Sequence, residues 1–600
     1  MENKRSRQFN KLFIIIGLII MALIVVFNIL TDSFNVFNDN LFKWYSYDFT
    51  QNPRTAKITY LKKIQKEKNY KNFIIGASGS SSIPTKKLKE YTRKDYFNCF
   101  YYGADLYDTV KTVKFLVKNY DVESIIMPFS IPSASKYHEN NRNLNYLLHP
   151  SVSGENKINF YKNYAFANPK YGIDKIKAEK NNTYLPDNFD VFNLDGSYDK
   201  RVRDTEYIGS KEDYIKNLDF KVYNEKIKLK NIDEAVAAIK SIKEMCQENN
   251  VDVKFILTPM SKMQNDRYDE KEVEEYLKKV SDVTEYWDFT DSTFENDPRF
   301  FYDPSHFRNA LGNLILDKIY KGQGEFGRFV KKGDYKKINS PTKNLEREFY
   351  IYAFHHLNDQ AEGLYTVDAK RFEEFLKFLR DNNIETVKFS DLISYVKGEK
   401  DLPEKFGIIT FDDGYSSNID IAYPILKKYG QVATIFPIGN LMGREKYPGN
   451  NKDMNKHFST EEAKKVEDVF EFGSHSYFFH QSYKIKGIKY RENLGMIEGE
   501  REKDFIKDFR EDSKKFKEVY RKFNNHEPYV FAYPQGIYNN LTEVLLTEEG
   551  YKVTVTSEEG KNTIVKYLPE SLRRLRRVNI SEDRDLKELI VKNWILINRI

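Results

Sequence analysis

Two short motifs hold the side chains best suited to chemistry. Residues 410–415 read Thr-Phe-Asp-Asp-Gly-Tyr and place Asp412 next to Asp413, and farther along the chain His475 and His480 stand five residues apart. Two imidazoles and one carboxylate, with a fourth position open, form the ligand set of a hydrolytic zinc site. The second carboxylate then remains available as a base. Asp-Asp-Gly alone is a common turn, so it is the combination of the two motifs that indicates a site.

The elements around these motifs are expected to bring them together. Residues 406–411 form an apolar run that predicts a buried strand, so the aspartate pair lies where a strand ends and a loop begins. The histidines likewise follow an apolar segment, residues 469–472. Strand ends are where α/β enzymes place their reactive groups.

The motifs resemble those of polysaccharide deacetylases of the NodB-homology class, over about residues 347–585. The five-residue histidine spacing and the Tyr-Ala-Phe-His-His of residues 352–356 are similar to the branch that acts on poly-N-acetylglucosamine exopolysaccharides. Residues 531–536, Phe-Ala-Tyr-Pro-Gln-Gly, resemble the third motif of the family. The resemblance implies an irregular (β/α) barrel with a metal ion at the carboxyl ends of its strands.

The resemblance also implies roles for individual residues. One divalent ion, expected to be Zn²⁺, would be bound by Asp413, His475 and His480. Asp412 would be the general base, and the backbone amide near Gln535, with Tyr533, would contact the substrate and its oxyanion.

One role is left without its usual residue. Many family members protonate the leaving amine with a histidine in a late Leu-x-His motif, but no histidine follows His526 here. His355 is the preferred substitute as catalytic acid, and His356 is either its alternative or a substrate contact. Arg576 and Arg577 lie near the final strand, where they either orient the base or face solvent.

A second group of residues lies in the first half of the chain. Residues 76–79, Gly-Ala-Ser-Gly, follow an apolar strand, and residues 303–306, Asp-Pro-Ser-His, precede a helical pattern. This combination resembles the SGNH (GDSL-like) hydrolases, and more closely the membrane-anchored branch of teichoic acid D-alanyl transfer and polysaccharide O-acetylation. It implies that Ser78 is a nucleophile, His306 its base and Asp303 the group that orients the base.

The SGNH pattern is incomplete. The serines at 80–82 compete with Ser78, and a serine-rich turn after a strand is often a helix cap. Gly103 matches the oxyanion glycine, but Phe129-Ser130 stands where Gly-x-Asn-Asp is expected. A binding-only domain therefore remains an alternative.

The composition and the order of elements define the architecture. Strand and helix patterns alternate over residues 36–325, which predicts a three-layer α/β/α domain with a mainly parallel sheet. Residues 326–345 are expected to be a linker, and residues 346–600 the deacetylase domain. The 96 basic and 89 acidic residues are interspersed, which gives no case for nucleic acid. The two cysteines are expected to be buried thiols.

Residues 12–30 are long and apolar enough to cross a membrane. Residues 1–11 are basic, so the positive-inside rule predicts a cytoplasmic N-terminus and extracytoplasmic catalytic domains. No Ala-x-Ala-like cleavage site follows, which favours a single-pass signal anchor in the cell membrane over the alternative of a cleaved signal peptide.

These expectations combine into a membrane-anchored, carbohydrate-modifying enzyme. Its C-terminal domain would N-deacetylate a β-linked N-acetylglucosamine-type exopolysaccharide, and its SGNH domain would hydrolyse or transfer an O-acyl ester. A peptidoglycan N-deacetylase is one alternative. A cell-surface glycan-binding or assembly protein with an inactive SGNH domain is another. The expected partners are an N-acetylated polysaccharide, the membrane, and membrane proteins of the polysaccharide synthase or acyltransferase kind.

Overall fold

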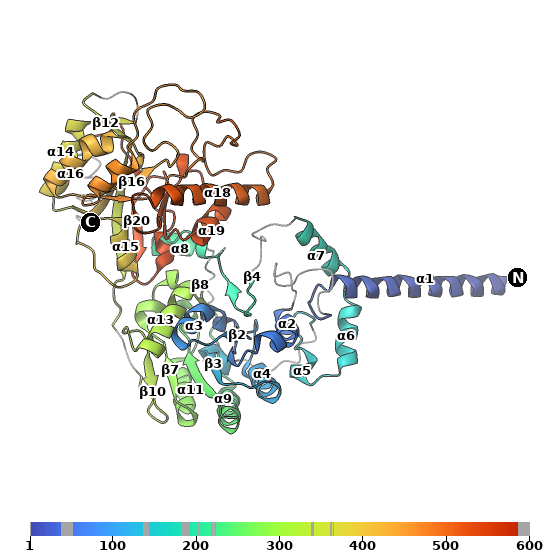
Figure 1. The fold of residues 1–600 in the computed structure, drawn as a ribbon. Coiled ribbons are helices and arrows are strands. Elements are labelled where there is room, and N and C mark those ends of the chain that lie inside the picture. Colours follow the sequence, from blue (N-terminus) through green and yellow to red (C-terminus); the bar gives the residue numbers. More distant parts are fainter. Residues whose placement is uncertain are drawn as a thin grey trace. The chain divides into compact units, whose positions relative to one another are not determined.

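The computed structural model describes residues 2–37, 52–135, 143–181, 191–337 and 341–585, except positions 202, 218–219, 221–223, 361–362 and 364. The chain divides into two compact units. The first contains residues 1–200 and 215–343, and the second contains residues 201–214 and 344–600. Each unit is described separately below (Figure 1).

The chain begins with a long apolar helix, α1 (Glu2–Thr31), which projects from the first unit (Figure 1). Its segment from Ser6 to Thr31 has the length and composition of a membrane-crossing helix, and its large apolar side chains are mostly exposed. Length and composition alone suit both a membrane anchor and a signal sequence.

The first unit is built on a six-stranded sheet. All neighbouring strands are parallel except the edge pair β10 and β7, which is antiparallel. Buried side chains of the sheet share one apolar core with helices α2, α4, α9 and α11. In spatial order the strands are β10 (Arg328–Val330), β7 (Tyr286–Asp288), β6 (Asp252–Leu257), β3 (Ser124–Phe129), β1 (Asn72–Ile74) and β2 (Tyr96–Asn98).

Strand β10 lies inside the segment that was expected to be a linker. Its Arg328 guanidinium pairs at 2.9 Å with the buried carboxylate of Asp288 on β7. This charged pair, together with Val330 in the core, stabilises the pairing of the segment with the edge of the sheet. The linker prediction relied on glycines and lysines and did not include these contacts.

Helices α2 to α13 occur between residues 53 and 321, and most of α8 falls in the segment 201–214 of the second unit. In chain order they are α2 (Pro53–Lys68), α3 (Thr85–Thr92), α4 (Leu106–Asn119), α5 (Pro150–Ser153), α6 (Lys157–Ala165), α7 (Lys170–Asn181), α8 (Lys211–Asn217), α9 (Ile232–Glu248), α10 (Lys262–Asn265), α11 (Glu270–Val283), α12 (Ser292–Glu295) and α13 (Asn309–Lys321). Two short strand pairs complete this part: β4 (Val191–Phe192) with β5 (Tyr198–Asp199), and β8 (Phe301–Asp303) with β9 (His306–Phe307).

The strands of the second unit close into a ring. Parallel pairing runs from β21 through β11, β15 and β16 to β17, and β18 pairs in parallel with β19. Parallel bridges from Ser474 to Phe531 and from Val555 to Leu575 join the two sets. The carboxyl ends of all these strands therefore lie at one rim, as expected for a (β/α) barrel.

The strands of this unit are β11 (Glu346–Phe354), β12 (His356–Asn358), β13 (Thr366–Asp368), β14 (Glu385–Thr386), β15 (Phe406–Asp413), β16 (Ala433–Pro437), β17 (Phe470–Phe472), β18 (Val530–Ala532), β19 (Val553–Val555), β20 (Asn562–Val565) and β21 (Val578–Asn579). The helices are α14 (Ala369–Asp381), α15 (Phe389–Val396), α16 (Tyr423–Tyr429), α17 (Thr460–Ala463), α18 (Glu502–Tyr520) and α19 (Asn540–Glu548). Aliphatic and aromatic side chains of the strands form the core, which explains the apolar runs in the sequence.

Candidate metal and catalytic site

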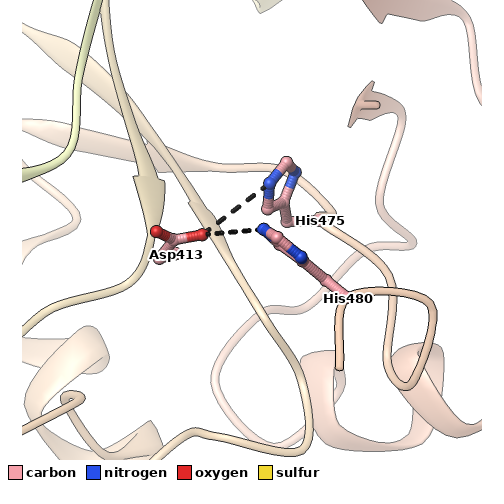
Figure 2. Close-up of side chains that lie close together, drawn as sticks. All are labelled: Asp413, His475 and His480. Carbon is pink, nitrogen blue, oxygen red and sulfur yellow. Dashed lines mark ion pairs between the residues drawn. The ribbon is translucent and has the colours of Figure 1, made fainter. Parts of the chain in front are cut away.

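Three potential metal ligands meet at the rim of the second unit. Asp413 ends β15, and His475 and His480 come from the loop after β17 (Figure 2). Asp413 Oδ1 lies 3.8 Å from His475 Nε2 and 3.5 Å from His480 Nε2. Ligands at about 2.0–2.1 Å from a tetrahedral ion lie about 3.3–3.5 Å apart, so this spacing is close to that of a zinc site.

The surroundings of these groups also fit a cation. His475 Nδ1 lies 2.9 Å from the carbonyl oxygen of Ala532, so Nδ1 carries the proton and Nε2 presents its lone pair to the site. Burial lowers the pKa of His475 to about 4, which keeps the ring neutral near pH 7. Within the described part of the chain, the buried Asp413 Oδ1 has no hydrogen-bond partner. An uncompensated carboxylate oxygen that faces two imidazole nitrogens is expected where a cation binds.

Asp412 is held by a different partner. Arg577 Nη1 and Nη2 donate to its two carboxylate oxygens at 2.7 and 2.9 Å, and both side chains are buried. Burial alone would raise the pKa of Asp412, but the Arg577 guanidinium and the nearby imidazoles hold it well below its ordinary value. The Asp412 carboxylate is therefore ionised, and its orientation is fixed by Arg577. Of the two uses considered for Arg577, the structure supports orientation of Asp412.

The adjacent arginine has a separate environment. The Arg576 guanidinium lies 4.9 Å from the ring centre of Tyr207, which belongs to the segment 201–214 of the same unit. Arg576 is thus the partner of an aromatic ring, and Arg577 is the partner of the carboxylate.

The two histidines at the end of β11 have different neighbours. His355 Nε2 lies 4.0 Å from Asp412 Oδ2, and its buried Nδ1 has no hydrogen-bond partner among the described residues. His356 Nδ1 lies 2.8 Å from the hydroxyl of Ser417. His355 is therefore the histidine beside the candidate base, and the proposed roles of both residues remain predictions.

Three residues of the site have backbone in the left-handed region: Asp413 at φ 68°, Ser476 at φ 68° and Gln535 at φ 56°. Each lies in one of the three sequence motifs. Such conformations cost free energy outside glycine and cluster at functional sites. Gln535 Oε1 accepts a hydrogen bond from Asn493 at 3.0 Å. The role of the backbone N–H near Gln535 at the oxyanion stays a prediction.

Tyr533 has a fully buried side chain, and its hydroxyl donates to the buried carboxylate of Glu543. Arg573 pairs with the same carboxylate. The ring therefore belongs to the interior hydrogen-bond network of the barrel. The predicted contact of Tyr533 with the substrate or its oxyanion stays a prediction.

Two further residues near the site were missed from the sequence. Asp512 on α18 accepts hydrogen bonds from the backbone N–H groups of Tyr477 (2.9 Å) and Phe478, which lie between the two candidate histidine ligands. His457 is buried, and its ring centre lies 4.8 Å from that of Tyr415. Neither residue belongs to a local motif, and only the tertiary contacts reveal them.

The first unit contains a separate serine, histidine and aspartate arrangement. Ser78 begins the short 3-10 helix η1 (Ser78–Ser82) after β1, and its Oγ lies 2.7 Å from His306 Nε2. His306 Nδ1 lies 2.7 Å from Asp303 Oδ1. This is the order of contacts in a catalytic triad.

The neighbouring serines are used differently. Ser80, Ser81 and Ser82 are buried, and Ser82 donates to the carbonyl oxygen of Phe307. The geometry thus favours Ser78 among the four serines. Gly103 has φ 57° and lies against Tyr146 and Arg54, and its oxyanion role stays a prediction.

Comparison with known proteins places the second site in a family. Residues 399–554 match the sequence model of the polysaccharide deacetylase family. YxkH of Bacillus subtilis is 32% identical over 194 residues, which are 32% of this chain and 60% of that protein. The poly-beta-1,6-N-acetyl-D-glucosamine N-deacetylase of Staphylococcus aureus is 28% identical over 274 residues, 44% of this chain and 86% of that protein.

Among solved structures, the Streptococcus pyogenes deacetylase PplD is 20% identical, with a TM-score of 0.32 over 41% of this chain and 97% of that chain. The sequence matches to residues 399–554 cover the candidate metal ligands and Asp412. The C-terminal unit therefore contains a polysaccharide deacetylase domain.

Proposed function

We propose that this protein is a metal-dependent N-deacetylase of a β-linked N-acetylglucosamine-type exopolysaccharide. The observation that carries the proposal is the cluster of Asp413, His475 and His480 beside the ionised, Arg577-bound Asp412. The relative from Staphylococcus aureus is named for activity on poly-beta-1,6-N-acetyl-D-glucosamine, which supports this substrate class. The substrate itself remains part of the proposal.

The chemistry follows from the positions of the residues. Asp413, His475 and His480 would hold a divalent ion, which would supply the Lewis acidity that polarises an acetamide carbonyl and makes water more acidic. Asp412 removes a proton from the attacking water, and Arg577 keeps its carboxylate ionised and aimed. The backbone N–H at Gln535 donates to the oxyanion of the tetrahedral intermediate. His355 protonates the nitrogen, so that acetate and a free amine leave.

The test separates the ligand from the base. Asp413→Ala should lose both the bound ion and acetate release, whereas Asp412→Asn should keep the ion and lose turnover. Metal content and acetate release are measured on the same preparations, with and without chelator. A purified protein that releases acetate with no bound metal would contradict the proposal.

Peptidoglycan is the alternative substrate. The five-residue histidine spacing and the first-strand histidine favour the exopolysaccharide. Acetate release from defined N-acetylglucosamine oligomers and from peptidoglycan, assayed side by side, distinguishes the two. Binding of either glycan without acetate release and without metal would instead support the glycan-binding alternative.

A second activity is proposed for the first unit, since Ser78, His306 and Asp303 are in contact as a triad. The reaction class is hydrolysis or transfer of an O-acyl ester through an acyl-serine. A fluorophosphonate probe should label Ser78, and Ser78→Ala should abolish the labelling. Modification at a serine within 80–82 would reassign the nucleophile, and the absence of labelling in the intact protein would favour a binding-only domain.

We also propose that α1 is a retained membrane anchor, with its N-terminus cytoplasmic and both units outside. Its outer end is part of the first unit, because the buried Asn28 side chain donates to the carbonyl oxygens of Ala165 and Ala167 at 3.0 and 2.7 Å. Cleavage of the helix would leave both carbonyls without these donors. If the helix is retained, a tag added at the N-terminus should remain on the mature protein in the membrane fraction.

A further inference from the structure

Helices α6 and α7 flank the outer end of α1 (Figure 1) and carry exposed apolar side chains. Ile173 and Ile176 lie one turn apart on α7 and are 45% and 39% exposed. Phe166, directly after α6, is 50% exposed. Large exposed apolar side chains on helices that both contact the apolar α1 are candidates for a binding surface.

The contacts of α1 place this surface at a defined membrane depth. A Cβ on Gly172 of α7 would lie 2.6 Å from both Phe27 and Thr31, so the two helices touch at the last turn of α1. Phe27 stands three residues before Leu30, the last residue of the apolar run. At about 1.5 Å of rise per residue, α7 therefore meets α1 within about 5 Å of the hydrocarbon boundary.

The polar residues of the two helices match the same location. Exposed lysines accompany the apolar side chains on or beside both helices: Lys157, Lys162, Lys170 and Lys177. Lysines extend their ammonium groups toward lipid phosphates while their alkyl chains lie along apolar surface. Apolar side chains interspersed with lysines are typical of helices that lie in a membrane interface.

We propose that α6 and α7 lie in the headgroup region of the outer leaflet of a phospholipid bilayer, with Phe166, Ile173 and Ile176 at the acyl boundary. The proposal rests on the membrane anchor proposed above. It adds that the first unit is held against the bilayer by a second contact. The hydrogen bonds from Asn28, and the Lys175 ammonium group 3.0 Å from the carbonyl oxygen of Asp32, lock this contact to the anchor.

The experiment uses the full-length protein with an N-terminal tag, reconstituted in vesicles of phosphatidylcholine and phosphatidylglycerol. Ile173→Cys is labelled with an environment-sensitive fluorophore; the native Cys99 and Cys246 are buried. The matched control is Phe329→Cys on β10, where the native side chain is 47% exposed in the same unit. Spin-labelled lipids should quench the label at 173 several-fold more than the label at 329.

Two outcomes would overturn the proposal. The first is equal quenching at the two positions together with equal access to aqueous iodide. The second is protection of position 173 in native membranes but not in vesicles of pure lipid, which would indicate a protein partner. Retention of the tag and flotation with the vesicles report on the anchor separately, so failure of the anchor is distinguishable from failure of the lipid contact.

Discussion

Asp412 and Asp413 are neighbours in sequence with opposite surroundings. One carboxylate binds the two nitrogens of Arg577, and the other faces two imidazoles. Asp413 adopts φ 68° at the end of β15, so the backbone leaves strand geometry at this residue. The two neighbouring carboxylates thereby face different partners. A dipeptide thus supplies both a candidate ligand and a candidate base.

Arg577→Met is expected to raise the pKa of Asp412, because the carboxylate would stay buried without its cation. Asp412 must be ionised to accept a proton. As the pH falls, the variant should therefore lose activity at a higher pH than the wild type does. Its kcat/KM near neutral pH should drop by about 10²- to 10⁴-fold. The control is Arg576→Met, which leaves the Asp412 pair intact. Identical acidic limbs in the pH profiles of Arg577→Met and the wild type would contradict this role.

His355→Ala should lower kcat by about 10²- to 10⁴-fold, because the leaving nitrogen needs a proton. The bound metal should remain, since His355 is not among the three candidate ligands. His356→Ala, which removes a ring bonded to Ser417, is the matched comparison. A His355→Ala enzyme with near-wild-type kcat would transfer the role to Asp412 or His356.

At the scale of elements, helix α18 holds the loop that carries both histidines. Asp512 accepts two consecutive backbone N–H groups between His475 and His480, at Tyr477 and Phe478. One carboxylate thereby fixes the path of the loop at its midpoint. The five-residue spacing requires such a support because the loop has no regular structure.

Asp512→Asn should weaken metal binding about tenfold or more. An amide offers one acceptor oxygen where two N–H groups need partners, and a buried unpaired N–H costs about 1–3 kcal/mol. Asp508→Asn, one turn earlier on α18 and paired with Arg491, is the control. Chelator competition measures the affinity, and equal affinities in the two variants would argue against the support role.

The same substitution should change the pH dependence of stability. Burial raises the pKa of Asp512 to about 6, above the ordinary value of 3.8. The folded state therefore binds the Asp512 proton more tightly than the unfolded state does. The stability that this proton contributes is lost as the pH rises through about 6. In metal-free protein, the unfolding free energy of Asp512→Asn relative to the wild type should increase between pH 4 and pH 7. Denaturant unfolding across this range tests the sign.

At the scale of the whole molecule, two candidate reactions lie in separate compact units. Ser78→Ala should leave acetate release unchanged, and Asp413→Ala should leave labelling of Ser78 unchanged, because each set of side chains belongs to its own compact unit and independent sites act additively. Both readouts are taken from each variant and from the double variant. Loss of one activity on mutation of the other site would reveal coupling between the units.

The candidate reactive residues, and the elements on which they lie, were identified from local sequence patterns. The apolar run before Asp412 predicted a strand, and the structure contains β15 there. The apolar segment expected to precede the histidines forms β17. The polysaccharide deacetylase domain was also predicted, and the family match confirms it. These features are local, because a strand and its terminal residues are encoded within a few positions.

The contact partner of each candidate residue follows from long-range packing. Arg577 reaches Asp412 across 165 residues, and His306 reaches Ser78 across 228. The same applies to Asp512 beneath the histidine loop, to the buried ring of Tyr533, and to the segment 201–214 in the second unit. Composition and spacing do not encode such contacts one by one, because they arise from the packing of whole elements, which fixes side-chain direction and burial together.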